Sequence, residues 1–271
     1  MTDASPDRSV RGMHMARATA ESFGVDADRY DRARPRYPEE LIARIVAAAP
    51  GTSLLDVGIG TGIEARQLRA AGCRVLGIEP DARMAELARR DGVDVEVSTF
   101  EAWDPAGRTF DGVVSATAWH WVGPLAGASK AAQVLAAGGL FAAFWNVGDV
   151  PPHVAGAFAA VYGRVAPDAL AARAYRHGGS MVDGYGAILD RAAEGLQATG
   201  AFGPAQRWRL DWERYYTRGE WLDALPTQGG NTRLAPQQLE ALLEATGEAI
   251  DALGGGFTMR YGSLALVGTR R

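Results

Sequence analysis

The stretch that decides the fold is Leu54-Leu55-Asp56-Val57-Gly58-Ile59-Gly60-Thr61-Gly62. Its apolar first half is typical of a buried strand, and the glycines that follow let the chain turn sharply and bring bare backbone against a ligand. Residues 63–71 then have a helical pattern that ends at Gly72. The segment therefore predicts a strand, a ligand-binding loop and a helix in direct succession.

Strand and helix patterns alternate through the first half of the chain. The strand patterns are 53–57, 74–78, 93–97, 110–116 and 139–145. Helical patterns lie between them, at 63–71, from Asp81 to Arg90 and at 125–137. Strands that alternate with helices of this length form a parallel sheet covered on both faces.

The pattern changes after Asn146. Residues from about 151 to 203 are predominantly helical, and we expect them to form a helical cap inserted over the carboxyl edge of the sheet, where open α/β sheets bind ligands. Two late strands, 207–214 and 257–267, flank a helix at 236–252 and are expected to close the sheet as a hairpin-like edge pair.

The N-terminal part lacks an apolar period, so residues 1–22 are expected to be loosely ordered. One domain is predicted over 23–271, beginning with a segment at 23–38 that is dense in Arg, Tyr and Pro. We expect this segment to close over the ligand as a lid.

Two carboxylates suggest the kind of ligand. The loop also fits the dinucleotide pattern G-x-G-x-x-G/A at 60–65, but Asp56 would repel a pyrophosphate and suits a ligand with a positive group. Glu79 ends the second strand, 17 residues past Gly62, where a carboxylate accepts ribose hydroxyls. A nicotinamide-dependent oxidoreductase is the disfavoured alternative.

Five blocks in order carry a family resemblance: YDRARPRYP at 30–38, LLDVGIGTG at 54–62, GIEPD at 77–81, FDGVVSATAWHWV at 110–122 and LAAGGLFAAFWN at 135–146. The chain resembles class I S-adenosylmethionine-dependent methyltransferases, specifically the type 11 small-molecule branch that includes trans-aconitate methyltransferase-like proteins. The resemblance implies a Rossmann-like, seven-stranded, mostly parallel sheet with helices on both faces. It also implies methyl transfer from S-adenosylmethionine to a small molecule by in-line displacement. A non-catalytic module that binds the same cofactor shares every motif and stays open as an alternative.

The resemblance also implies the cofactor contacts. They are Tyr30, Arg34, Asp56, Gly58, Gly60, Gly62, Glu79, Pro80, Thr99, Phe100, Glu101 and Ala116. The chain departs from the family at 98–101, which reads Ser-Thr-Phe-Glu where an acidic residue often holds the adenine amino group. We expect Phe100 to pack on the adenine, with the polar contacts supplied either by backbone groups or by Glu101 as the substitute carboxylate.

His120 follows the fourth strand and is the candidate catalytic residue. It is predicted to be a general base, to orient a substrate or cofactor group, or to be structural, and the sequence leaves these three roles open. Arg34 is expected to clamp a carboxylate, or else to be solvated. Tyr30 is expected to present its ring to the sulfonium, or else to pack in the ordinary way.

The predicted substrate contacts are aromatic. They are Tyr37, Trp119, Trp121 and Trp145, with ring-face contact to the sulfonium a second role for Tyr37 and core packing the alternative for Trp119 and Trp121.

Composition excludes several classes of protein. Cys73 is the only cysteine among 271 residues, so a disulfide scaffold is excluded. The formal net charge of −4 argues against nucleic acid or an anionic membrane as partner, and no apolar run is long enough to span a membrane. No histidine or cysteine has partners at metal-ligand spacing, so no metal is predicted. We expect a cytoplasmic enzyme, with its oligomeric state open.

Overall fold

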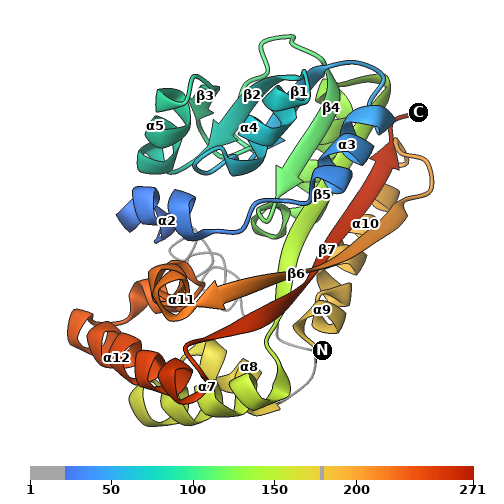
Figure 1. The fold of residues 1–271 in the computed structure, drawn as a ribbon. Helices are drawn as coiled ribbons and strands as arrows, with labels where there is room; N and C mark the ends of the chain where they lie inside the picture. The colour runs from blue at the N-terminus through green and yellow to red at the C-terminus, as the bar shows by residue number, and fades with distance from the viewer. Residues whose placement is uncertain (1–21, 178–179) are drawn as a thin grey trace, which may run out of the picture.

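The computed structural model describes residues 22–177 and 180–271. In these residues one sheet has the strand order β3-β2-β1-β4-β5-β7-β6. The strands are β1 (Ser53–Val57), β2 (Arg74–Glu79), β3 (Asp94–Val97), β4 (Phe110–Ala116), β5 (Leu135–Asp149), β6 (Gln206–Thr217) and β7 (Gly256–Thr269). Pairs from β3 to β5 are parallel, and β7 is antiparallel to β5 and β6. The predicted seven-stranded, mostly parallel sheet is confirmed (Figure 1).

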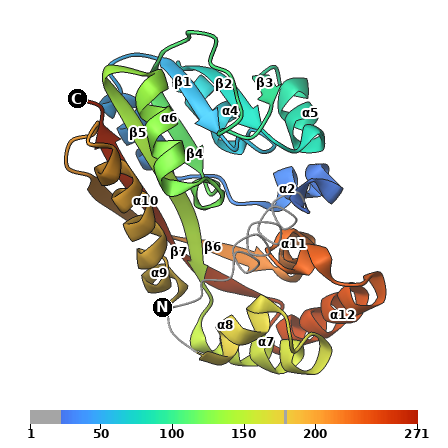
Figure 2. The ribbon, with the colours of Figure 1, turned by 180° about the vertical axis from the view of Figure 1, so that it is seen from behind.

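Helices cover both faces of this sheet. One face is covered by α3 (Glu39–Ala48), α4 (Ile63–Ala70) and α5 (Ala82–Arg90). The other is covered by α6 (Pro124–Val134) and α10 (Gly186–Thr199), which pack side by side (Figure 2). The central strands are buried on both faces, so their apolar residues are consecutive and not alternating.

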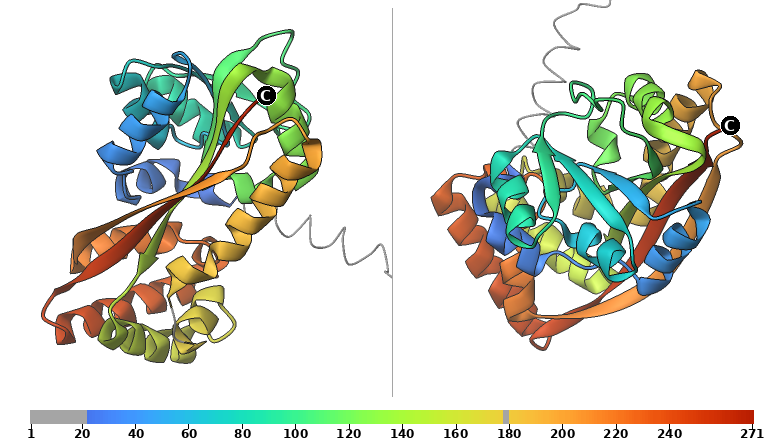
Figure 3. Two further views of the ribbon diagram at one scale, coloured as in Figure 1. Left: turned by 90° about the vertical axis from the view of Figure 1, so that its right-hand side faces the viewer. Right: turned by 90° about the horizontal axis from the view of Figure 1, so that it is seen from above.

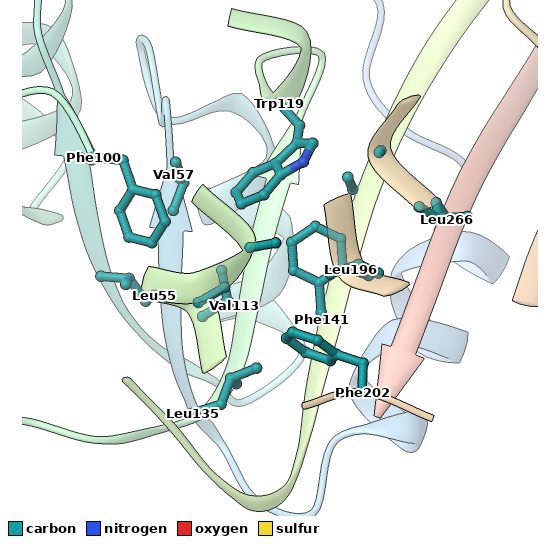
Figure 4. Close-up of a cluster of buried hydrophobic side chains, with 14 of the residues drawn as sticks. Leu55, Val57, Phe100, Val113, Trp119, Leu135, Phe141, Leu196, Phe202 and Leu266 are labelled. Carbon is teal, nitrogen blue, oxygen red and sulfur yellow. The ribbon is translucent and has the colours of Figure 1, made fainter. Parts of the chain in front are cut away.

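Neighbouring residues of one strand serve the two opposite cores. In β1, Leu55 belongs to the core under α6 and α10, whereas Leu54 belongs to the core under α3 to α5. Figure 4 shows the first of these cores, in which Leu55, Val113 and Phe141 lie together from three adjacent strands. The glycine loop therefore leaves a strand that is fixed from both sides.

Three strands continue beyond the sheet's carboxyl edge into a second group of helices, here called the far lobe (Figures 1 and 3). The far lobe consists of α7 (Pro152–Val165), α8 (Leu170–His177), α11 (Arg218–Ala224) and α12 (Pro236–Ala252) with the nearby ends of β6 and β7. The strands are longer than predicted: β5 has 15 residues, β6 has 12 and β7 has 14. Their extra residues support a separate aromatic core.

The predicted helical cap at 151–203 is helical, but it is divided between two places. Helices α7 and α8 pack with α12 in the far lobe, whereas α10 returns along the sheet to pack against α6. The short α9 (Met181–Gly184) contacts β5 between them. The sequence pattern could not show this division, because it reports helical periodicity and not the partner of each helix.

The N-terminal segment 23–38 lies between the two parts of the molecule. It contains η1 (Phe23–Asp26) and α2 (Ala27–Ala33), followed by extended chain. Helix α2 contacts α5 on one side and α11 on the other. The predicted loosely ordered N-terminus falls almost wholly in residues 1–21, outside the described part. Three short helical turns complete the chain: η2 (Trp119–Trp121), η3 (Leu225–Thr227) and η4 (Asn231–Arg233).

Candidate functional site

The glycine loop between β1 and α4 has the backbone that the sequence predicts. Gly58, Gly60 and Gly62 have φ of +73°, +57° and +84°, a region that other residues rarely adopt. A Cβ at Gly58 would lie 2.5 Å from the Cβ of Ala118. Glycine is therefore required at Gly58 by conformation and by space.

A cavity lies against this loop. It is closed by the N-terminal segment on one side and by the ends of β4 and β5 on the other. The lining residues are Tyr30, Arg34, Pro35, Tyr37, Gly58, Ile59, Gly60, Thr61, Ile63, Glu64, Ala116, Thr117 and Asn146. The cavity thus brings together predicted residues from three separate motifs of the sequence, together with several that the sequence did not single out.

Two carboxyl groups are buried at the loop without a full set of partners. Asp56 on β1 is 0% exposed, and neither of its oxygens accepts from an N–H or hydroxyl group of the described residues; its side-chain partner is the carboxyl of Glu64. Burial, with the charge of Glu79 as a smaller cause, raises the pKa of Asp56 to about 7. Glu64 in the first turn of α4 is 4% exposed, and its Oε1 also has no partner there. Burial, followed by the charge of Asp56, raises the pKa of Glu64 well above its ordinary value.

Glu79 connects β2 to the glycine loop. Its carboxylate accepts hydrogen bonds from the backbone N–H of Gly60 and of Asp81, each at 2.9 Å. Burial raises the pKa of Glu79 to about 7, and these two hydrogen bonds oppose the shift. Each carboxylate oxygen keeps a second acceptor site, so Glu79 remains able to accept from a ligand hydroxyl.

The N-terminal segment presents a cation and two aromatic rings to the cavity. The Arg34 guanidinium lies 4.9 Å from the centre of the Tyr30 ring and donates to the carbonyl of Thr227 at 3.0 Å. Its Nε is buried and has no partner in the described residues. The hydroxyl of Tyr37 forms a 2.7 Å hydrogen bond with the hydroxyl of Thr117. Thr117 has φ of +55°, so the end of β4 is held in a strained conformation at the cavity.

His120 is fixed by Trp145. The Trp145 indole N–H donates to His120 Nδ1 at 3.2 Å, and burial lowers the pKa of His120 to about 4. An indole N–H can only donate, so Nδ1 accepts and the proton of the neutral ring is on Nε2. In this state His120 is a weak base and a hydrogen-bond donor. Of its three predicted roles, the geometry favours orienting a polar group.

The predicted substrate tryptophans differ in their surroundings. Trp145 is 0% exposed and orients His120, and Trp119 is 3% exposed and packs against Phe141 in the core. Of the two roles predicted for Trp119, the structure therefore favours core packing. Trp121 is 38% exposed and lies beside His120, with ring centres 4.4 Å apart. Of the three, Trp121 has the exposed surface needed for contact with a substrate.

Comparison with known proteins agrees with this geometry. Residues 55–143 match the family model described as a methyltransferase domain. An uncharacterised methyltransferase of Mycobacterium tuberculosis is 34% identical over 130 residues, which are 47% of this chain and 53% of the relative. The ubiquinone biosynthesis O-methyltransferase of Methylocella silvestris is 30% identical over 145 residues, which are 51% and 52% of the two chains. The chain spans about half the length of these curated relatives.

Residues 55–143 are therefore similar to a methyltransferase domain, and this part of the chain is called the methyltransferase domain below. A solved structure from Anaeromyxobacter dehalogenans, named as a type II methyltransferase, shares the fold of this domain with a TM-score of 0.56 and 21% identity, covering 87% of this chain and 97% of the other. The type 11 branch expected from the sequence motifs remains a prediction.

The cavity of the methyltransferase domain fits S-adenosylmethionine. This cofactor has an ammonium, a sulfonium and a carboxylate at its methionyl end. The cavity lining offers the Oε1 of Glu64 and the Nε of Arg34, and Asp56 lies next to Glu64 on the strand that leads into the glycine loop. Buried polar groups without partners are rare in proteins, and a ligand of complementary charge accounts for them.

The predicted adenine side of the methyltransferase domain is less open. The Phe100 ring is 3% exposed and lies between Trp103 and Trp119, so it faces the core. Glu101 accepts from the backbone N–H of Gly123 at 2.8 Å. The cavity lining in the described residues does not include Asp56, Gly62, Glu79, Pro80, Thr99, Phe100 or Glu101. Their roles as cofactor contacts remain predictions.

Sequence reasoning missed Glu64 and Thr117. A signal for Glu64 was present, because a glutamate between the apolar Ile63 and Ala65 begins a helix that is buried over its first turn. The sequence held no signal for Thr117, since its positive φ appears only in the folded backbone.

Neither a metal site nor a membrane-spanning helix is present in the described residues. No group of three or more His, Cys, Asp or Glu side chains there is placed to hold a metal ion. Across 22–177 and 180–271, no helix has both the length and the apolar character that crossing a bilayer requires.

Proposed function

We propose that this protein transfers the methyl group of S-adenosylmethionine to a small-molecule acceptor by in-line displacement. The observation that carries the proposal is a set of buried charged groups at the glycine loop: Glu64 and Arg34 line the cavity, and Asp56 lies on the strand that leads into the loop, next to Glu64. This set complements a ligand with both charges at one end.

Residues in and beside the cavity bind different parts of the cofactor. Asp56 faces the positive end of the cofactor, Arg34 holds a carboxylate, and Glu79 accepts from the ribose hydroxyls. Tyr30 and Tyr37 cover the cavity and exclude water. S-adenosylmethionine, when bound, supplies a methyl group already activated by its sulfonium and is left as S-adenosylhomocysteine. The protein then contributes mainly alignment, which supplies several kcal/mol.

His120 orients the acceptor in this proposal. Its Nε2–H donates to a polar group of the acceptor, while Trp145 holds the ring from the other nitrogen. The acceptor brings its own lone pair, so an ionised acceptor or an amine needs no base before the transfer, and the proton that a hydroxyl or amine acceptor loses passes to solvent water. Trp121 supplies an exposed aromatic surface next to His120.

A small molecule is favoured as acceptor because the N-terminal segment covers the cavity and the formal net charge of −4 disfavours nucleic acid. The curated relative from Methylocella silvestris is named as an O-methyltransferase, which makes hydroxylated small molecules the first class to test. We keep the cytoplasm as the proposed compartment, since a chain with one cysteine has no disulfide of its own to stabilise it elsewhere.

The test begins with titration calorimetry on S-adenosylmethionine, S-adenosylhomocysteine and NADH. Binding of the first two and not of NADH is expected, and the reverse would overturn the proposal. Transfer of radiolabelled methyl groups is then measured against pools of hydroxylated, amine and carboxylate small molecules, with RNA and protein as parallel acceptors. Binding without transfer to any acceptor would favour the non-catalytic module instead.

A further inference from the structure

Glu64 is a buried glutamate that the fold does not need. It stands in the first turn of α4 between Ile63 and Ala65, both of which are buried. An ionised carboxylate is expensive to bury without a partner, and an apolar side chain of similar size would fill the position at lower free energy. The Oε1 atom of Glu64 nevertheless has no hydrogen-bond partner in the described residues, and the residue lines the cavity. Its carboxyl therefore faces a space that a ligand can fill.

Asp56 is the neighbour that most affects the protonation of Glu64 after burial itself. Asp56 is 0% exposed, and its side-chain hydrogen bond is with the carboxyl of Glu64, while no N–H or hydroxyl group of the described residues donates to it. Two carboxyl groups that face one another in a site without water do not both ionise, because each charge raises the pKa of the other. The directions are consistent with this rule: the charge of Asp56 raises the pKa of Glu64, and Asp56 itself is shifted to about 7. The unbound pair therefore retains at least one proton at pH 7.

The other charged groups around the pair do not neutralise it. Glu79 on β2 adds a further negative charge, and Tyr37 on the N-terminal segment is a buried phenol that stays neutral. The charge of Arg66 on α4 lowers the pKa of Glu64, but its guanidinium donates to Asp31, Asp91 and the carbonyl of Thr61. A cation that enters the cavity can therefore replace the proton that the two carboxyl groups share.

We propose that Glu64 and Asp56 form a paired carboxyl site that binds the ammonium group of the cofactor's methionyl end and releases a proton to solvent when that cation enters. The proposal rests on the proposed function and adds Glu64 as a direct cofactor contact. It makes cofactor affinity rise with pH, because the pair must lose a proton before it presents a full negative charge to the ligand.

The experiment is calorimetry with S-adenosylhomocysteine at pH 6.5, 7.0, 7.5 and 8.0, each in two buffers of different ionisation enthalpy, so that protons released are counted. In the wild type we expect proton release, because the buried pair retains a proton before the cation enters. In Glu64→Gln, release should fade as the pH passes 7. The ligand's own titration is common to both proteins, so the difference between them isolates Glu64.

Affinity provides the second readout. Glu64→Gln should weaken S-adenosylhomocysteine about tenfold at pH 8, the loss expected for one charge-assisted hydrogen bond. 5′-Methylthioadenosine, which lacks the ammonium and the carboxylate, should bind both proteins equally and release no proton. Glu86→Gln, at an exposed glutamate on α5, is the matched control and should change neither quantity.

Glu64→Leu separates binding from structure. It should raise the melting temperature of the unliganded protein and weaken S-adenosylhomocysteine at least as much as Glu64→Gln does. If both variants alter only the melting temperature and leave proton release and affinity as in the wild type, the role of Glu64 is structural and the inference is wrong. A wild type that binds S-adenosylhomocysteine without proton release also overturns it. A wild type that binds neither cofactor form refutes the proposed function itself.

Discussion

The region around the glycine loop, residues 56–81 and here called the cofactor side, differs from the far lobe in the kinds of side chain that it buries. In the described residues every buried charged side chain lies between 56 and 81, namely Asp56, Glu64, Glu79 and Asp81. The far lobe buries aromatic rings instead, such as Phe158, which stacks on Trp221 with ring centres 5.7 Å apart. Its buried polar groups are neutral. The buried carboxyl groups of the cofactor side therefore lower the stability of the unliganded protein, whereas the aromatic core of the far lobe raises it.

The match to the family model covers the cofactor side and ends before the far lobe. The family model ends at residue 143, just before β5 leaves the sheet for the far lobe. The matched part holds the glycine loop and the acidic residues to which we assign cofactor binding. The part beyond the match contributes Asn146 and, through Thr227, the contact that holds Arg34. This division suggests that acceptor choice is set by the second half of the chain.

The largest expected effect tests whether the far lobe acts only through stability. Phe158 on α7 is 1% exposed and contacts Tyr175, Trp221 and Phe257. Phe158→Ala should lower the free energy of unfolding by about 3–5 kcal/mol, because it leaves a cavity in a packed core. The dissociation constant for S-adenosylhomocysteine should stay within twofold of the wild type. Urea unfolding and calorimetry measure the two quantities.

Phe158→Leu is the matched control and should lose less stability, because most of the volume is retained. A loss of cofactor affinity in Phe158→Ala that is absent in Phe158→Leu would show that the two regions are coupled, and would break the comparison.

The second effect is confined to the cofactor side. Glu79→Ala should weaken both S-adenosylhomocysteine and 5′-methylthioadenosine about 100-fold, since the ribose is common to the two ligands. Calorimetry with both ligands separates this variant from Glu64→Gln, which should affect only the first. Glu213→Ala, at an exposed glutamate on β6 paired with Arg260, should change neither. Retention of 5′-methylthioadenosine binding by Glu79→Ala would contradict the ribose role.

The third effect concerns the state of His120. Burial lowers its pKa to about 4, against about 6.5 in the unfolded chain. The folded protein therefore binds fewer protons than the unfolded chain between these values, and the free energy of unfolding should fall as the pH drops from about 6.5 to 4. Imidazole nitrogen shifts measured by NMR should report a neutral ring with the proton on Nε2 at pH 7, and His120→Gln assigns the signal. An apparent pKa near 6.5 would restore the general-base role.

The sequence predicted the cofactor side far better than the far lobe, for a physical reason. A glycine that needs positive φ, or a carboxylate at a strand end, is specified locally, so Gly58 and Glu79 are recognisable without the fold. The fate of Phe100 and Trp145 depends on which surfaces pack together, and both proved to be core residues. The division of the 151–203 helices between α6 and α12 is likewise a long-range choice, made by packing and not by periodicity.

The smallest effect tests the N-terminal segment, whose helix α2 contacts both regions. Arg32 on α2 donates to both oxygens of Asp223 on α11 at 2.8 Å, and the charge and hydrogen bond of Arg32 lower the pKa of Asp223. Such exposed ion pairs contribute about 0.2–1 kcal/mol, so Asp223→Asn should weaken S-adenosylhomocysteine by at most about fivefold. Asp251→Asn, which breaks an exposed pair with Arg218 within the far lobe, is the matched control and should leave affinity unchanged.

Hydrogen exchange in residues 27–37 gives the more sensitive measurement of this link. In the wild type it should slow when S-adenosylhomocysteine is added, because the N-terminal segment then closes on a filled cavity. In Asp223→Asn the unliganded exchange should be faster, since α2 loses its support on α11. If the glycine loop becomes protected on binding while 27–37 is unchanged in both proteins, the N-terminal segment is not a lid. The cofactor side would then bind its ligand without help from the far lobe.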